Sequence, residues 1–172
     1  FAISYYEFAE ARTSLVARIG GVTDAKPLCF TGHIDTVPLG AAPWSANPFA
    51  ADIADGKLYG RGTSDMKSGV AAFVVAAIRL ARELETGPGM VLIITAGEET
   101  GCEGAYHLAG LGNVLGDAGA IVVAEPSSNL PFIGHKGALW LKAVANGLTA
   151  HGSMPELGVN AIYKAARTIS QL

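Results

Sequence analysis

The sequence predicts an α/β fold with a mostly parallel sheet and helices on both of its faces. Apolar runs of strand length lie at residues 14–19, 27–31, 90–96 and 120–124, and segments of helix length separate the later runs. Half of the 172 residues are hydrophobic, which is enough to bury one substantial core. The segment 67–85 is apolar almost all round in its first half, which is typical of a helix buried against such a sheet.

A change of character after Pro126 predicts a second domain. Before it, the helical segment 67–85 becomes charged and ends at Gly87-Pro88-Gly89. After it, residues 137–146 alternate like a new strand, and residues 159–172 have a helical pattern. We therefore expect a first domain at residues 1–136 and the beginning of a small α+β domain at residues 137–172. Neither end of the chain carries a start or stop signal, so we expect a piece of a longer protein.

Composition excludes several classes of partner. The formal net charge is -3 and Lys and Arg form no run, which argues against a nucleic-acid-binding protein. The most apolar stretch, residues 69–81, is too short to span a membrane, and no signal-peptide pattern opens the chain. Two cysteines, Cys29 and Cys102, are too few for a disulfide framework, so we expect reduced thiols in a cytoplasmic protein. A small-molecule or peptidic partner fits this composition better.

Candidate ligands follow three of the predicted strands. His33 and Asp35 come after LCFTG, the pair Glu98-Glu99 comes after VLIITAG, and Glu125 comes after AIVVA. The carboxyl ends of parallel strands share one edge of a sheet, which is where open α/β folds place their ligand crevice. We therefore expect these side chains to converge at that edge.

Each of these short motifs has a simpler reading when it is taken alone. The spacing of His33 and Asp35 puts both side chains on one face, where Asp35 can accept a hydrogen bond from the ring nitrogen that is not on a metal. A histidine at a strand end is, however, often only a surface residue. In the Glu98-Glu99 pair, one carboxylate can bind metal while its neighbour takes a proton from metal-bound water. The alternative for this pair is a solvated acidic loop.

Asp65 lies in the glycine-rich segment YGRGTSDMKSG. A phosphate-binding loop is excluded there because the spacing G-x-x-x-x-G-K-S/T does not occur. Asp65 could instead cap the following helix, and Glu125 by itself indicates little. Together, one histidine and three or four carboxylates at one edge would repel one another unless divalent cations bind them. Mixed histidine and carboxylate ligation suits zinc, cobalt or manganese.

Five ordered motifs make the chain resemble the zinc aminoacylase-like metallopeptidases. This family includes acetylornithine deacetylase, succinyl-diaminopimelate desuccinylase and carboxypeptidase G. The resemblance extends from about Leu15 to the last residue, and its motifs are GHIDTVP (32–38), YGRGTSDMKSG (59–69), AGEETG (96–101), AEPS (124–127) and AHGSMPELGVNAI (150–162).

The resemblance implies a role for each candidate residue and a zinc-peptidase-like catalytic domain followed by a lid and dimerisation domain. Two divalent metal ions are implied, with zinc favoured and cobalt or manganese as alternatives, and so is a homodimer at full length. A cis peptide bond is implied after Asp65, and a further histidine ligand of the second metal is implied beyond Leu172. The implied roles are His33 and Glu125 on one metal, Glu99 on the other, Asp65 bridging both, Glu98 as general base, Asp35 orienting His33, and His151 in the lid stabilising the oxyanion.

We therefore expect metal-dependent hydrolysis of an amide bond in N-acyl amino acids, of the deacetylase or desuccinylase type, by a water activated between two metal ions. The alternatives are an aminopeptidase or dipeptidase of the same fold, acting on short peptides, and a non-catalytic metal-binding relative. Glu98 argues against the last, because a mere binding site needs no base. His107 and His135 match no ligand of the family, and Cys102 is a less favoured soft ligand.

Overall fold

The computed structural model describes residues 1–171. The chain divides into two compact units, and the first of them comprises Phe1–Pro131. The second begins at Phe132, close to the boundary expected between residues 136 and 137. The roles of the two expected domains stay predictions.

A five-stranded sheet forms the centre of the first unit. Its strand order is β1-β2-β6-β3-β7, in which β3 pairs in parallel with both β6 and β7. The pairings of β1 with β2 and of β2 with β6 are antiparallel. The expected α/β class is confirmed, and the sheet is mixed, although only β2 runs against the other strands. The strands are β1 (Ala2–Ala9), β2 (Arg12–Ile19), β3 (Leu28–His33), β6 (Met90–Thr95) and β7 (Ala120–Val123).

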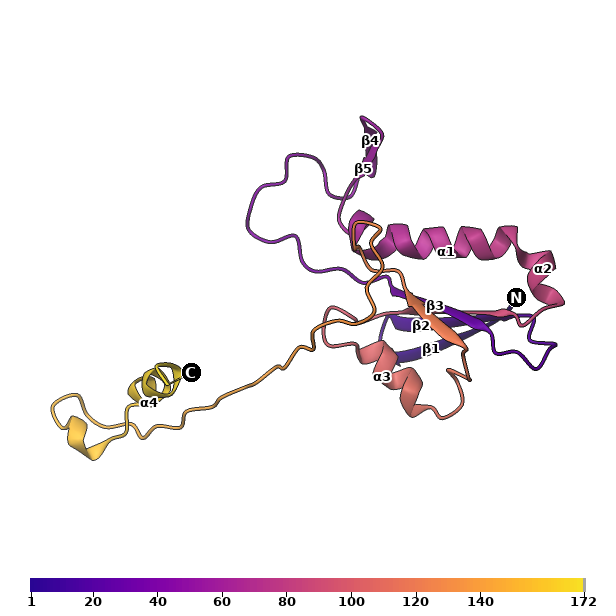
Figure 1. The fold of residues 1–172 in the computed structure, drawn as a ribbon. Coiled ribbons are helices and arrows are strands. Elements are labelled where there is room, and N and C mark those ends of the chain that lie inside the picture. Colours follow the sequence, from indigo (N-terminus) through magenta and orange to yellow (C-terminus); the bar gives the residue numbers. More distant parts are fainter. Residues whose placement is uncertain (172) are drawn as a thin grey trace. The chain divides into compact units, whose positions relative to one another are not determined.

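Helices cover both faces of this sheet, as expected (Figure 1). On one face lie α1 (Ser68–Arg79) and α2 (Ala81–Glu85), and on the other lies α3 (Glu103–Gly110). Neighbouring strand residues point to opposite faces, so the core has two layers. Phe73 and Ala77 of α1 pack with Ala17 and Leu92, whereas Leu108 of α3 packs with Val16, Cys29 and Val91. Among the described residues, no helix is long and apolar enough to cross a bilayer.

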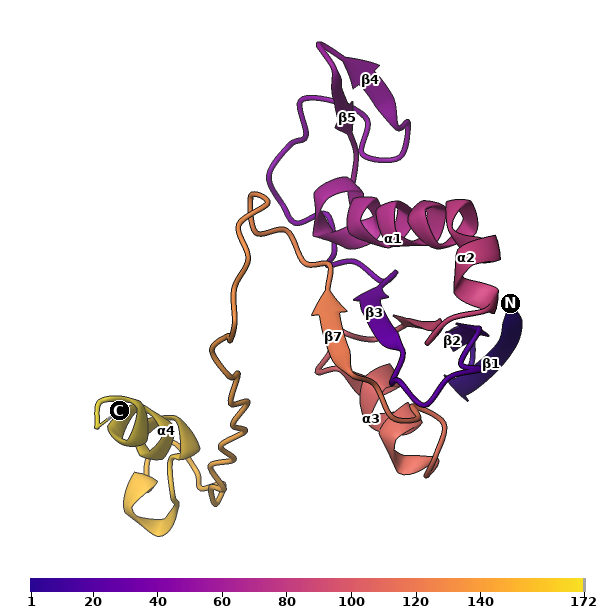
Figure 2. The same cartoon turned by 45° about the vertical axis from the view of Figure 1, so that its right-hand side comes forward.

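Some elements differ from the expectation. The helix predicted over residues 67–85 is two helices, because Leu80 leaves the helical conformation, with φ −95° and ψ 9°. Two short strands, β4 (Asp52–Ala54) and β5 (Lys57–Tyr59), form a separate antiparallel pair that projects beyond α1 (Figure 2). These two strands were not predicted, because their sequences DIA and KLY contain no apolar run. All six residues are exposed.

The strand predicted over residues 137–146 is wrong. The described structure assigns no strand there, and Leu139, Trp140 and Leu141 are more than 80 % exposed. Alternation alone does not make a strand, because its backbone groups need a partner strand with which to pair.

The helix predicted over residues 159–172 is α4 (Ala161–Ile169), and Leu172 lies outside the described residues. The side chain of Asn160 caps this helix by accepting hydrogen bonds from the backbone N–H groups of Ile162 and Tyr163. The 3-10 helix η2 (Pro155–Leu157) precedes it.

Candidate metal centre

The parallel strands end side by side and carry the candidate ligands. β3 ends at His33, which pairs with Thr95 at the end of β6, and Thr31 pairs with Val123 at the end of β7. Figure 2 shows β3 and β7 ending side by side. Glu98 and Glu99 follow β6 after Ala96 and Gly97, and Glu125 follows β7 after Ala124. The convergence expected at the carboxyl edge of the sheet is therefore observed.

The His33 ring is the centre of this group and is only 1 % exposed. Its Nε2 atom lies 3.3 Å from Asp65 Oδ1, 3.6 Å from Glu125 Oε1 and 3.8 Å from Glu98 Oε2. One ligand atom from each of His33, Asp65 and Glu99 lies within 4.8 Å of the other two. The structure thus brings together all four predicted metal-binding residues and the predicted base.

Asp65 lies in η1 (Thr63–Lys67), a π-helical turn in which Asp65 and Met66 have non-helical backbone angles. The Asp65–Met66 peptide bond is cis, as the resemblance implied. Asp65 does not cap α1, whose N-cap is Lys67. Met66 is buried, and its Sδ atom accepts a hydrogen bond of 3.2 Å from the backbone N–H of His33. The sequence places Met66 in the motif YGRGTSDMKSG but did not predict its contact with His33.

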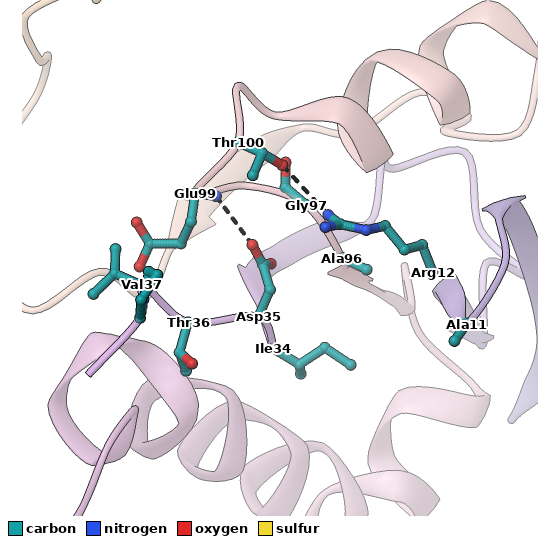
Figure 3. Close-up of a pocket in the computed structure, with 11 residues that line it drawn as sticks. Ala11, Arg12, Ile34, Asp35, Thr36, Val37, Ala96, Gly97, Glu99 and Thr100 are labelled. Atoms are coloured by element: carbon teal, nitrogen blue, oxygen red, sulfur yellow. Dashed lines mark hydrogen bonds between the residues drawn. The ribbon is translucent and has the colours of Figure 1, made fainter. Parts of the chain in front are cut away.

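Asp35 contacts the site through two different groups. The Nδ1 atom of His33 lies 3.0 Å from the backbone oxygen of Asp35 and 3.5 Å from its Oδ1, so the carbonyl is the nearer partner. Because a carbonyl only accepts, Nδ1 carries a proton, and in the neutral ring Nε2 offers its lone pair to a metal. The Asp35 carboxylate accepts hydrogen bonds from the backbone N–H groups of Glu98, at 3.1 Å, and Glu99, at 3.0 Å. Figure 3 draws the bond to Glu99. It therefore fixes the turn that carries both glutamates.

The carboxyl pKa values of the site are shifted from their ordinary values in different directions. Burial raises the pKa of Asp35, but backbone N–H groups, foremost those of Glu98 and Glu99, together with His33 hold this pKa below its ordinary value. Burial raises the pKa of Glu99, and the charges of Asp65 and Glu98 raise it further. Burial also raises the pKa of Glu125, although His33 opposes this.

One oxygen of the site has no partner. Oε1 of Glu99 is buried and accepts no hydrogen bond from any described residue. A desolvated carboxylate beside other carboxylates is costly unless a cation compensates it. The donor set and this unpaired oxygen therefore fit a divalent metal ion.

Replacing Asp35 by Asn should weaken both the fold and the metal site. The amide keeps one acceptor but turns an NH2 group toward a backbone N–H, and a hydrogen bond to a charged group contributes about 1.5–3 kcal/mol. Loss of a partner that holds a ligand typically costs ~10–100-fold in metal affinity. Because the folded pKa of Asp35 is lowered, its contribution to stability disappears as the pH falls through that pKa, and Asp35→Asn should lack this acid-dependent loss.

Urea unfolding at several pH values and zinc titration calorimetry measure these effects. Asp24→Asn, at an exposed loop position, is the matched control and should behave like the wild type. Unchanged zinc affinity in Asp35→Asn would show that the turn holds its geometry without this carboxylate.

Residues 29–170 match the family model described as Peptidase family M20/M25/M40. The chain belongs to this family. The family resemblance inferred from the five motifs is thereby confirmed. The M20 match covers both units, from β3 to the end of α4.

Known proteins agree with this M20 assignment. The chain is 42% identical over 155 residues to the probable succinyl-diaminopimelate desuccinylase of Staphylococcus epidermidis, covering 89% of this chain and 38% of that protein. The chain thus spans less than half the length of this relative. Human carnosine dipeptidase 1 has a TM-score of 0.57 at 26% identity, over 70% of this chain and 29% of its own. A Staphylococcus aureus tripeptidase shares the fold, with a TM-score of 0.60 at 23% identity over 99% of this chain and 46% of its own.

The remaining histidines and Cys102 lie outside the ligand group. His151 is exposed in the second unit, and its role at the metal centre stays a prediction. His107 lies in α3 beside Phe8, and His135 contacts the Lys136 carbonyl. Cys102 Sγ lies 3.8 Å from Glu98 Oε1, and burial followed by the Glu98 charge raises the pKa of this thiol. The sequence did not reveal this contact with the predicted base.

Proposed function

We propose that this M20 chain provides most of the metal-binding and catalytic residues of a hydrolase that cleaves the amide bond of N-acyl amino acids. The observation that carries the proposal is the buried Nε2 of His33, which faces the carboxylates of Asp65, Glu98 and Glu125 at one sheet edge. The similarity to desuccinylases supports an acylated substrate.

The residues present would hold two divalent ions, with zinc favoured and cobalt or manganese as alternatives. His33 and Glu125 would hold one ion, Glu99 would hold the other, and Asp65 would contact both. When bound, such ions polarise a substrate carbonyl and lower the pKa of water. The unpaired Oε1 of Glu99 supports its role as a ligand.

The chain's own side chains would then move the protons. Glu98 lies next to the proposed ligand Glu99, and its Oε2 is on the His33 side of the site. Its carboxylate would take a proton from the attacking water and deliver it to the leaving amine. Asp35 would hold the Glu98–Glu99 turn still during both transfers. His151 would donate a hydrogen bond to the oxyanion, reaching it from the lid of a homodimeric enzyme.

A dipeptidase is the second candidate. The structural likeness to human carnosine dipeptidase 1 supports this candidate, because the two chains share the fold at 26% identity. The two candidates differ in whether the substrate carries an acylated or a free amino group.

Assays of the whole enzyme test the proposal. Zinc- or cobalt-loaded protein should hydrolyse N-succinyl or N-acetyl amino acids, lose this activity to a chelator and regain it with metal. Cleavage of free dipeptides alone would favour the dipeptidase. Metal binding without hydrolysis of either substrate class would instead indicate a non-catalytic relative.

A further inference from the structure

The ring of His151 is held by its neighbour Ser153. Its Nδ1 atom lies 2.8 Å from the Ser153 hydroxyl oxygen, and the Ser153 backbone N–H donates to the same Nδ1 atom at 3.2 Å. A backbone N–H has no acceptor function, so Nδ1 must offer its lone pair. The proton of a neutral imidazole must then be on Nε2.

We propose that Ser153 is a positioning residue that fixes His151 in the tautomer protonated at Nε2. The ring then presents an N–H donor on the side away from Ser153. This inference rests on the proposed function, in which His151 donates to the oxyanion of the substrate. The opposite tautomer would present a lone pair at Nε2, which would repel a negatively charged oxygen.

The loop around His151 is built to hold this arrangement. The backbone N–H of Met154 donates to the His151 carbonyl at 2.9 Å, which closes a turn around Ser153. Leu148 and Val159 exchange two backbone hydrogen bonds of 2.9 Å and close the loop at its base. At Gly158 an added Cβ would lie 2.7 Å from Ala150 Cβ, so the two sides of the loop touch there. These contacts hold the loop in which Ser153 lies beside Nδ1 of His151.

The opposite ring nitrogen is available for a substrate. Across residues 1–171, no hydrogen bond of the structure involves His151 Nε2, and the residue is exposed. The Ser153 hydroxyl can serve as a donor or an acceptor, but beside a lone pair it donates. Two donors on one nitrogen therefore favour the same tautomer.

The tautomer can be measured directly, without any assay of activity. Long-range proton–nitrogen correlation spectra of the whole chain, labelled with nitrogen-15 histidine, distinguish the two neutral forms. The chain has 4 histidines, and the loss of one signal set in His151→Gln assigns His151. The spectra are recorded at a pH at which the ring is neutral.

The expected wild-type spectrum shows only the Nε2-protonated form of His151. Ser153→Ala removes one donor and should admit a measurable fraction of the other form. Ser153→Asp places an acceptor beside Nδ1 and should move the proton onto that atom. Ser170→Ala, an exposed serine of the same unit, should leave the spectrum unchanged. Wild type and Ser153→Ala showing the same mixture of forms would overturn the inference.

Kinetics of the whole enzyme separate this inference from the proposed function. If His151 is the oxyanion donor, Ser153→Ala should lower kcat more than it changes KM, because the donor acts on the transition state. The loss should stay below the ~100–1000-fold that removal of a complete donor costs. A shifted tautomer with unchanged kcat would support the role of Ser153 and contradict the proposed role of His151.

Discussion

Glu98→Gln is expected to lower kcat of the whole enzyme by about 100–10,000-fold, the usual contribution of a general base. The amide has nearly the same shape as the carboxylate but cannot accept the proton of the attacking water. Glu98 is not among the proposed ligands, so the metal content should stay near that of the wild type. Steady-state kinetics and metal analysis of the same purified protein measure both quantities.

Glu83→Gln is the matched control for this change, because Glu83 is exposed in α2 and the substitution removes the same charge. It should keep wild-type activity and metal content. Retained turnover in Glu98→Gln would remove Glu98 as the base. Loss of metal together with activity would instead make Glu98 a ligand.

Glu99→Gln is expected to change metal affinity and stability in opposite directions. Loss of a ligand should weaken zinc binding by more than the ~10–100-fold that loss of an indirect partner costs. Without metal, however, the variant should be more stable than the wild type. Its neutral side chain avoids both the burial of a charge and the repulsion from Asp65 and Glu98 that raise the pKa of Glu99.

The same reasoning gives a pH dependence for the metal-free protein. A carboxyl whose folded pKa is raised binds its proton more tightly in the folded state, so stability rises as the pH falls from above the folded pKa toward the unfolded value. In Glu99→Gln, the part of this rise in stability that comes from Glu99 should be absent.

Urea unfolding of the chelated proteins and zinc calorimetry measure both effects, with the exposed Glu85→Gln as the control. A metal-free Glu99→Gln that is less stable than the wild type would contradict the electrostatic account of this site.

Four of the five strands were predictable because each contains a run of apolar residues. β2, β3, β6 and β7 all lie within two residues of the runs read from the sequence. The strand β1 (AISYYEFA) was not predicted, because polar residues such as Ser4 and Glu7 interrupt its apolar residues. Edge position did not decide this, since β7 lies at the opposite edge with all four residues exposed and was predicted from its apolar run. Conversely, residues 137–146 alternate but find no partner strand in the described structure, so pattern alone led to a wrong strand.

The candidate site was predicted more fully than the fold around it. His33, Asp65, Glu99 and Glu125 were named from four of the motifs, and the structure brings the three carboxylates close to the His33 ring. The way in which Asp35 acts could not be read from its spacing. Its carbonyl lies nearer to the ring than its carboxylate does, and the carboxylate binds a turn 63 and 64 residues further along the chain.

The sequence by itself determined which residue types follow the strands, and hence the metal chemistry they suit, because ligand identity and strand ends are local properties. Only the tertiary structure decided which group faces which. Three features depend on contacts between distant segments. They are the N–H groups that hold Asp35, the sulfur of Met66 beside His33 and the unpaired oxygen of Glu99. Those contacts follow from how helices and strands pack, and local patterns do not contain that information.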